Sequence, residues 1–469
     1  MRIFILLLVA CGLARADTAS LPERYVAWKY AAEVQVRNTG PRERLREVID
    51  VGLRLPASRA GNLKGDARVV LKRGYDELVR EVPFQIYDIA TSGGYTTCRV
   101  AFCADLPANS SQRFAVFYDN PAARAPVFEP MVRLVRSAGS LAVRTPFYAA
   151  EFDEETGQCV GLKSLVAPGG TLYAEPADHR GGSPWPLPSV SVPALETEEN
   201  RPEALRLAKA SGDGEEILEG PVFAAVRGRR HFLGKAGEAP AALDFAYVFY
   251  AEAPHFVVGT AVSFLRDTNV YSLETNALGA DQALLTHYLF RPVTPTFPLT
   301  EIEEVGSVMV DTATRKGYPD GDLLAGMLPA DLAWNAVSNI DSGLTATGFN
   351  LLRKDSAPNR HAANYRASTR ARLREGWVEW SNAPVYVTAR ERLSDAILVS
   401  QGTVFRSAQA VALSNFKDGD WRAKTDDYGR RLNTPMEINI YPRGTGVADD
   451  EKALPHYGVR VDAYLRGIR

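Results

Sequence analysis

The chain has 469 residues, of which 46% are apolar and 23% are charged. This composition is ordinary for a folded globular protein and excludes a largely disordered chain. The formal net charge of −2 lacks the basic excess of a dedicated nucleic-acid-binding protein, so we expect no nucleic-acid partner. The length allows two or three domains with a substantial core.

Residues 1–16 have the pattern of an export signal. Arg2 supplies a positive charge, an apolar run follows, and Ala14-Arg15-Ala16 has the small-x-small cleavage pattern. The apolar run is too short to span a bilayer. We therefore expect a secreted or periplasmic protein. In the alternative, residues 8–11 (LVAC) form a lipobox, and an acylated Cys11 would anchor the protein to a membrane at the cell surface. We expect a membrane partner only in that case.

Three cysteines remain after cleavage, so at least one thiol stays free unless it pairs between chains. Cys98 and Cys103 are five positions apart on an expected strand, hence on opposite faces, and we expect no bridge between them. There is no CxxC motif and no Cys/His cluster with zinc spacing, so we expect no metal site built on cysteine. We interpret the three cysteines as small buried side chains.

The first predicted domain is a β-sandwich over residues 20–124. Residues 32–37 alternate between apolar and polar and end at an Asn-Thr-Gly turn, and residues 49–55 alternate until Pro56. Short alternating strands separated by turn residues are typical of a sandwich. Further strands are expected at 69–71, 82–87, 99–103 and 113–118. Residues 125–139 are interpreted as a linker.

The remaining residues, 140–469, are predicted to form one large β-domain. Its opening is a hairpin, with strands at 147–152 and 159–165 around a turn at 153–157. A short helix is expected at 202–210. Longer strands follow from Gly220, and such long paired strands suit a large sheet. They are expected at 221–227, 229–233, 243–250, 256–264 and, as one extended segment, 365–380.

Two segments of this domain resemble the galactose-mutarotase-like β-supersandwich of carbohydrate-active proteins. Residues 147–165 (FYAAEFDEETGQCVGLKSL) resemble its opening, in which a strand ending in Phe-Asp precedes a Gly turn and a strand ending in Leu. Residues 244–264 resemble its central strands. The resemblance covers residues 140–440. The fold class we expect is therefore all-β, a small N-terminal sandwich followed by a large antiparallel supersandwich. The resemblance implies a concave sheet that binds saccharide, as in polysaccharide lyases. The catalytic His, His and Glu of mutarotases have no matching positions here, so mutarotase activity is not implied.

The densest run of polar residues, Tyr271–Arg291, is the first candidate site. If residues 286–291 form a strand, His287 and Arg291 share one face and Tyr288 lies on the other. A helix over residues 281–290 is the alternative and would break this face. We interpret His287 and Tyr288 as catalytic, and Asn276 and Arg291 as substrate-binding.

These residue types suit β-elimination from a uronic acid. The reaction needs a cation at the carboxylate, a base for the C5 proton and an acid for the leaving oxygen. The planar fork of Arg matches a carboxylate, and His or Tyr suits the other two roles.

A second candidate site lies at the start of the extended segment expected at 365–380 and continues along it. We interpret His361 and Tyr365 as catalytic, because a metal-independent lyase uses these residue types. A basic, aromatic face could hold an anionic polysaccharide, whereas the alternative is an ordinary solvated strand face. Further substrate-binding candidates have side chains that can hydrogen-bond to a sugar or stack on it. They are Arg360, Asn364, Trp377, Trp380, Arg230 and His231.

Three functions are consistent with these patterns. We predict an exported carbohydrate-active enzyme, a polysaccharide lyase whose partner is an acidic polysaccharide or oligosaccharide. The alternatives are a non-catalytic carbohydrate-binding or cell-surface β-protein, and a glycoside hydrolase or sugar isomerase with paired carboxylates. We expect no cofactor. The alternative is Ca²⁺ at the acidic turns 319–322 or 418–420, although neither matches an EF-hand loop and an ordinary turn is the simpler interpretation.

Overall fold

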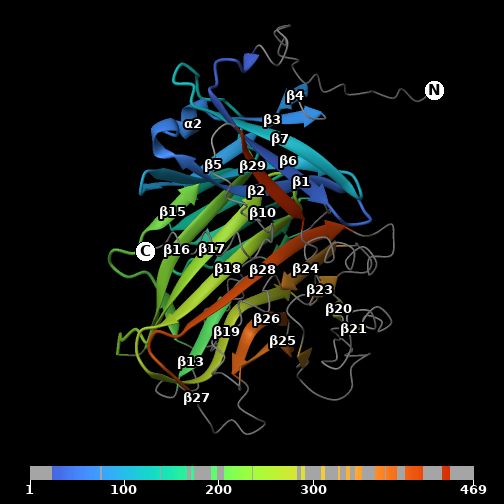
Figure 1. Cartoon of the computed structure of the whole chain (residues 1–469). Coiled ribbons are helices and arrows are strands. Elements are labelled where there is room, and N and C mark those ends of the chain that lie inside the picture. Colours follow the sequence, from blue (N-terminus) through green and yellow to red (C-terminus); the bar gives the residue numbers. More distant parts are fainter. Residues whose placement is uncertain are drawn as a thin grey trace, which may run out of the picture.

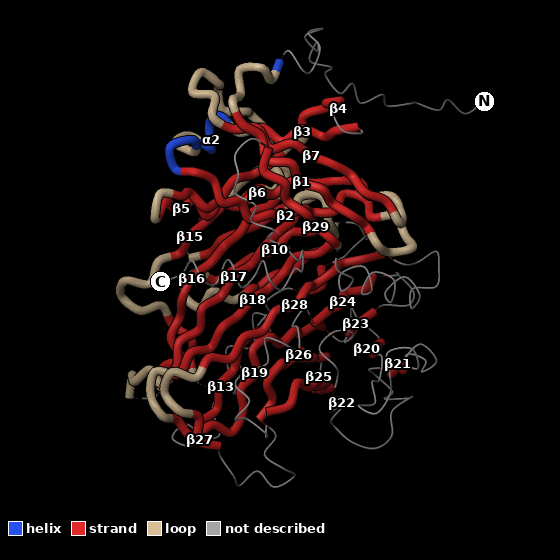
Figure 2. The backbone as a smooth tube through the Cα atoms, viewed as in Figure 1, coloured by secondary structure: helices blue, strands red, loops and turns tan. Residues whose placement is uncertain are grey.

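The protein is described by a computed structural model. Its described residues, to which every structural statement below applies, are 24–73, 77–137, 139–165, 171–173, 192–197, 205–234, 236–281, 287–290, 308–311, 326–327, 334–338, 344–350, 365–374, 377–387, 397–415 and 436–443. Strands dominate the described chain, and helical segments are short and lie near the N-terminal sandwich (Figure 2). The predicted all-β fold class is confirmed.

Two sheets form the N-terminal sandwich. One has the order β29-β1-β7-β3-β4 and the other β2-β6-β5. Their facing sides enclose a core in which Val34, Val51, Val100, Phe102 and Phe114 are almost fully buried. The elements are β1 (Tyr30–Asn38), β2 (Arg44–Pro56), a 3₁₀ turn (Ala57–Arg59), α2 (Leu63–Asp66), β3 (Arg68–Arg73), β4 (Glu77–Glu81), β5 (Phe84–Ser92), β6 (Tyr95–Leu106), β7 (Ser110–Tyr118) and β29 (Glu437–Arg443).

A ten-stranded antiparallel sheet is the centre of the molecule. Its order is β14-β16-β17-β18-β28-β24-β23-β20-β21, with β15 also paired to β16. The strands are β14 (Arg206–Ala208), β15 (Glu215–Leu218), β16 (Phe223–Leu233), β17 (Ala241–Tyr250), β18 (His255–Phe264), β20 (His287–Phe290), β21 (Val308–Asp311), β23 (Trp334–Ser338), β24 (Leu344–Asn350) and β28 (Val404–Asn415). Figure 1 shows its long strands running diagonally below the N-terminal sandwich.

Two smaller sheets accompany it. One has the order β12-β11-β10-β9-β8, and the other β13-β19-β26-β25-β22 with β27 paired to β19. Their strands are β8 (Arg133–Ser137), β9 (Ser140–Arg144), β10 (Tyr148–Asp153), β11 (Cys159–Ser164), β12 (Thr171–Tyr173), β13 (Val192–Thr197), β19 (Thr268–Asp281), β22 (Gly326–Met327), β25 (Tyr365–Arg374), β26 (Trp377–Val387) and β27 (Ile397–Val399).

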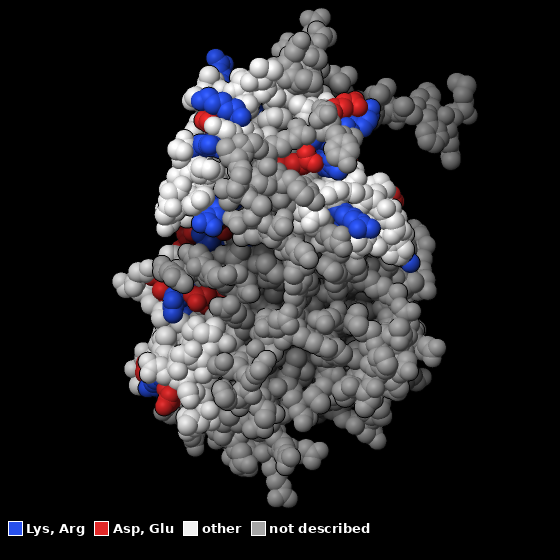
Figure 3. All heavy atoms as spheres, in the orientation of Figure 1, with Lys and Arg blue, Asp and Glu red and all other residues white. Residues whose placement is uncertain are grey.

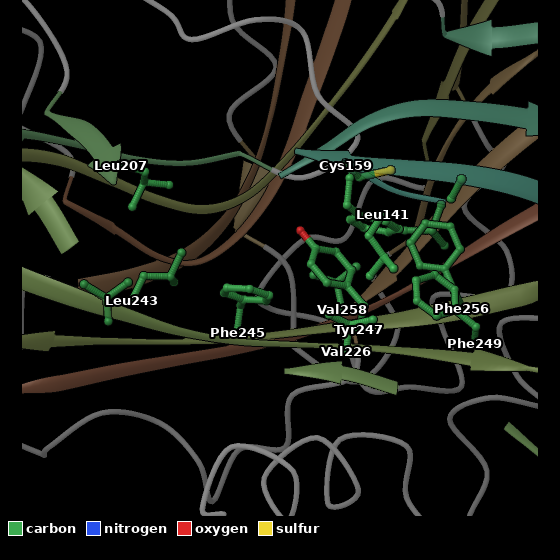
Figure 4. Packing of buried hydrophobic residues seen from close by; sticks show 14 of the residues in the cluster. Leu141, Cys159, Leu207, Val226, Leu243, Phe245, Tyr247, Phe249, Phe256 and Val258 are labelled. Carbon is green, nitrogen blue, oxygen red and sulfur yellow. The ribbon is translucent and has the colours of Figure 1, made fainter. Parts of the chain in front are cut away.

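Both faces of the sheet are covered at β17 and at the start of β16, which explains why nine of the ten residues of β17 and the first four of β16 are apolar or aromatic. On one face, Tyr247 and Phe249 pack toward Leu141 and Cys159 of the β8–β12 sheet (Figure 4). On the other, Phe223 lies edge-on to Tyr87 of β5, with ring centroids 5.2 Å apart. The N-terminal sandwich is thus docked onto the large sheet through a second hydrophobic core.

Three expected elements differ in the structure. Arg206–Ala208 is strand β14, so the helix expected at 202–210 is wrong for these residues, because pairing with β16 overrides a weak local preference. The two strands expected at 221–227 and 229–233 are one strand, β16. The extended segment expected at 365–380 is a hairpin of β25 and β26, with Arg374 opposite Trp377.

The domain boundaries stay a prediction. Two strands do not follow the expected division of the chain. Strand β8 lies within the predicted linker 125–139, and β29, from the predicted domain 140–469, pairs with β1 of the N-terminal sandwich.

The cysteines have the environments expected of small buried side chains. Cys98 contributes to the sandwich core, whereas Cys103 packs against the core between sandwich and large sheet, so the two lie on opposite faces of β6. No disulfide joins any of the three described cysteines to another. Burial raises the pKa of the Cys98 thiol to about 12 and raises that of Cys159 as well, which keeps both thiols protonated and unreactive. No helix in the described ranges is long and apolar enough to cross a membrane.

Candidate functional site

Several predicted site residues lie outside the described residues. They are Arg291, Arg360, His361 and Asn364. The same holds for the export signal with Cys11 and for the acidic turns 319–322 and 418–420. These assignments therefore stay predictions.

The first predicted site is divided between two sheets. His287 and Tyr288 lie on β20, opposite Ser338 and Val337 of β23, so the strand expected there is confirmed and a helix at these positions is wrong. Asn276 lies on β19, which belongs to the six-stranded sheet rather than to the large one.

The second predicted site keeps part of its arrangement. Tyr365 begins β25, opposite Val387. Residues directly opposite each other in an antiparallel pair share a face of the sheet. Arg374 and Trp377 therefore share one face, whereas Trp380, opposite Ala371, lies on the other. The assignment of Trp377 and Trp380 to substrate binding stays a prediction.

Arg230 has a structural environment. Its side chain is 0% exposed and forms an ion pair with Glu215. Its Nε donates to the Glu155 carbonyl at 2.7 Å and its Nη2 to the Glu154 carbonyl at 2.6 Å. The guanidinium also lies over the Phe245 ring, 5.1 Å from the centroid. The donors of Arg230 are thus engaged inside the fold.

His231, unlike the fully buried Arg230, is a predicted residue whose titratable partners lie in a partly exposed environment. Its Nε2 lies 3.5 Å from Asp213 Oδ2, and both side chains are mostly but not fully buried. Two positions earlier on β16, Arg229 Nε lies 3.8 Å from Asp244 Oδ1 of β17. The side chains of Arg229 and Asp244 are 31% and 14% exposed. We call these four residues the Arg229–His231 cluster.

Backbone pairing explains how the cluster is assembled. Arg229 stands directly opposite Asp244 in the β16–β17 ladder. Strand β14 pairs with β16 at His231, and β15 pairs with it at Gly228, so the connection between them runs beside Arg229 and His231. Within that connection Asp213 closes a tight turn by accepting a hydrogen bond from the Ala210 amide at 2.8 Å.

The electrostatics of the cluster centre on Asp244. Burial, reinforced by Asp213, raises the pKa of the Asp244 carboxyl, although Arg229 and His231 act in the opposite direction. The 3.8 Å separation is too long for a direct hydrogen bond between Arg229 Nε and Asp244 Oδ1. Both atoms are buried, and neither has a hydrogen-bond partner among the residues that the structure describes.

The cluster lies on the same face of the large sheet as Phe223 and Ala225, which the N-terminal sandwich covers at the start of β16. That cover ends at Arg227, which lies 3.6 Å from Asp88 of β5 and also pairs with Glu216. Figure 3 shows charged side chains of both signs close together on the side where the N-terminal sandwich meets the large sheet. Beyond Arg227 on the same face come Arg229 and His231.

Sequence reasoning found one member of the cluster and missed three. His231 was singled out, whereas Arg229, Asp213 and Asp244 were not. The alternation Arg227, Arg229, His231 on an expected strand was a usable signal for a polar face. The register that brings Asp244 opposite Arg229 was not readable from the sequence, because the hairpin loop is long enough to allow several pairings. In the described part of the chain, no group of three or more His, Cys, Asp or Glu residues could hold a metal ion.

No protein-family model matches the sequence, and neither does any curated protein. Solved structures do match. A protein in the glycosyl hydrolase family 38 from Enterococcus faecalis is 12% identical, with a TM-score of 0.49 over 89% of this chain and 48% of that chain. A putative aldose 1-epimerase from Klebsiella pneumoniae is 8% identical, with a TM-score of 0.40 over 66% of this chain and 89% of that one. A galactose mutarotase related enzyme from Lactobacillus acidophilus is 7% identical, with a TM-score of 0.35 over 61% and 99%.

These matches include the class of protein that the sequence pattern resembles. The chain spans about half the length of the family 38 protein. With identities of 12% or less, the matches assign no substrate and no residue role to this chain.

Proposed function

We propose that this chain is an exported carbohydrate-active enzyme that cleaves a uronate-containing polysaccharide by β-elimination at the Arg229–His231 cluster. The observation that carries the proposal is the grouping of an imidazole, two carboxyls and a guanidinium on a partly exposed end of a sheet face. Export rests on the N-terminal sequence pattern, and a lipid anchor on Cys11 is its alternative.

Each cluster member has a role in the proposed reaction. Arg229 binds the uronate carboxylate, since its side chain is 31% exposed and its planar guanidinium matches a carboxylate. His231, oriented by Asp213, takes the C5 proton. Asp244 protonates the leaving oxygen, because its raised pKa lets it hold a proton at a higher pH than an exposed aspartic acid.

A second reaction class uses the same groups on a neutral sugar. Asp213 and Asp244 would then act as the paired acids of a hydrolase or isomerase, with Arg229 bound to a hydroxyl. Binding without catalysis is the third possibility, with Arg374 and Trp377 sharing a face of the β25–β26 hairpin.

The products distinguish these possibilities. A lyase forms a 4,5-unsaturated uronate that absorbs in the near ultraviolet and consumes no water, whereas a hydrolase forms reducing ends without that absorbance. We expect near-ultraviolet absorbance with at least one polysaccharide of a uronate panel, unchanged by EDTA if no Ca²⁺ takes part. Reducing ends without absorbance would refute elimination. Retardation of the protein in gels containing the polymer, without either product, would favour binding alone.

Variants connect the reaction to the cluster. We expect Arg229→Gln and Asp244→Asn each to lower kcat/KM by about 100-fold or more, the usual contribution of a group in proton transfer or charge stabilisation. Arg266→Gln is the matched control, since Arg266 is also a half-exposed arginine paired with a carboxylate, 4.0 Å from Glu238. His287→Ala and Tyr288→Phe test the predicted site on β20 in the same assay, and Tyr365→Phe tests β25. Loss of activity in these variants alone would move the site to those strands.

A further inference from the structure

One strand of the N-terminal sandwich, β29, is formed by residues 437–443, far from the rest of the sandwich in the sequence. Strand β29 pairs antiparallel with β1 in one unbroken register, from Ala31 opposite Arg443 to Arg37 opposite Glu437. Figure 1 shows β29, in red, beside the blue β1. On its other side β1 pairs with β7, so β29 is the terminal strand of that sheet among the described strands.

Side chains next to and within β29 contribute to the sandwich core. Met436 and Ile438 are each 2% exposed and belong to the same cluster as Val34 and Val36. Asn439, the next residue after Ile438, is only partly buried and stands opposite Gln35. This is the alternation of a strand with one face on a core.

Without β29, the sandwich would be open along β1. The backbone groups of β1 that face β29 would lose their partners, and the core around Val34 and Val36 would lose the cover of Met436 and Ile438. Such an open edge binds an extended peptide by adding it as a strand.

We propose that this edge of β1 is a strand-binding site whose ligand is the chain's own segment 436–443, and that the N-terminal sandwich closes only when this late segment arrives. The register fixes the ligand class, namely an extended peptide with apolar side chains at alternate positions. Contacts between distant parts of a chain form late, because closing the intervening loop costs entropy first. In a protein made from its N-terminus, the sandwich would therefore remain open until residues 436–443 have been made.

The first experiment uses the full chain with cysteines at Gln35 and Asn439, which stand opposite each other at partly exposed positions. Opposite residues of an antiparallel pair have Cα separations within the range that a disulfide needs. We expect Q35C/N439C to form an intramolecular disulfide on oxidation, whereas pairing Q35C with a cysteine at Arg443 gives none. No disulfide in Q35C/N439C would overturn the assigned register.

The second experiment displaces β29 within the full chain. Ile438→Asp places a charge in the sandwich core, and Asn439→Asp places the same charge at a partly exposed position of the same strand. We expect hydrogen exchange at β1 amides to be at least about tenfold faster in I438D than in N439D, with β17 and β18 unchanged. Equal exchange rates at β1 in the two variants would contradict the proposal.

A peptide supplied separately tests binding at the edge. A synthetic peptide of residues 434–443 should restore slow exchange at β1 of I438D, while the same peptide with Ile438→Asp should not. Wild-type protein should not bind the peptide, because its own β29 occupies the site. Failure of the natural peptide to restore β1, or equal effects of both peptides, would overturn the proposal. These outcomes do not depend on the glycan or on the reaction.

Discussion

The role of Arg230 can be tested by replacing it with methionine. Methionine keeps most of the apolar stem of the arginine and removes its charge and donors. If Arg230 is structural, Arg230→Met lowers the free energy of unfolding without lowering the affinity for substrate. If it binds substrate, as its sequence position suggested, the effects are reversed.

The size of the effect follows from the partners of Arg230. The substitution removes charged hydrogen bonds to the carbonyls of Glu154, Glu155 and Arg229, and it removes the ion-pair partner of Glu215. Removing one partner of a buried ion pair costs about 3–5 kcal/mol. Glu215 keeps a second partner, Arg136 Nη2 at 3.3 Å, so we expect a loss near the lower end, about 3 kcal/mol.

Urea unfolding followed by tryptophan fluorescence measures this loss, and the double variant R230M/E215M completes a thermodynamic cycle. Because the double variant leaves no unpaired glutamate, we expect it to recover part of the loss, by about 1–2 kcal/mol. A loss below about 1 kcal/mol in R230M, together with weakened glycan binding, would refute the structural role.

Three further predictions concern single positions. Burial raises the folded-state pKa of Asp244 above its unfolded value, so this carboxyl favours folding least when it is ionised. Asp244→Asn should therefore gain stability relative to wild type as pH rises from about 3 to 7, measured as urea midpoints; a gain that grows toward low pH would contradict this sign. Gly157 has φ +69°, and an added Cβ would lie 2.6 Å from Phe245 Cε1. Gly157→Ala should cost about 2–4 kcal/mol from strain and overpacking, and a thermal unfolding midpoint within a degree of wild type would show that the turn can relax. Tyr87 donates to buried Asp50 at 2.6 Å. Tyr87→Phe should cost about 1.5–3 kcal/mol by urea unfolding, and a loss below about 0.5 kcal/mol would mean that Arg99 satisfies Asp50 by itself.

Local patterns predicted much of the fold. The alternation in residues 32–37 and 49–55 predicted β1 and β2, because one face of each strand is buried in the sandwich core. The apolar strands β17 and β18 were also anticipated, since both of their faces are covered. A pattern of burial is a local property of the chain and can therefore be read from the sequence.

Pairings between distant segments were not predictable in this way. Nothing local in residues 437–443 indicates that they complete a sandwich formed by the N-terminal residues. The Arg229–His231 cluster likewise depends on the register of β16 and β17 and on a turn that carries Asp213 beside them. Arg230 and His231 are neighbours with similar polarity, yet one lies inside the fold and the other on the partly exposed face, because successive residues of a strand alternate.

The central claim is that the Arg229–His231 cluster carries out proton transfer on a uronate. Its most direct test is kcat/KM of His231→Asn on the glycan that gives near-ultraviolet absorbance, beside Arg266→Gln and with the unfolding transition measured on the same samples. We predict a fall of about 100-fold or more for His231→Asn, an unchanged value for Arg266→Gln, and an unfolding midpoint close to wild type in both. Near wild-type kcat/KM in folded His231→Asn would contradict the assignment of the base.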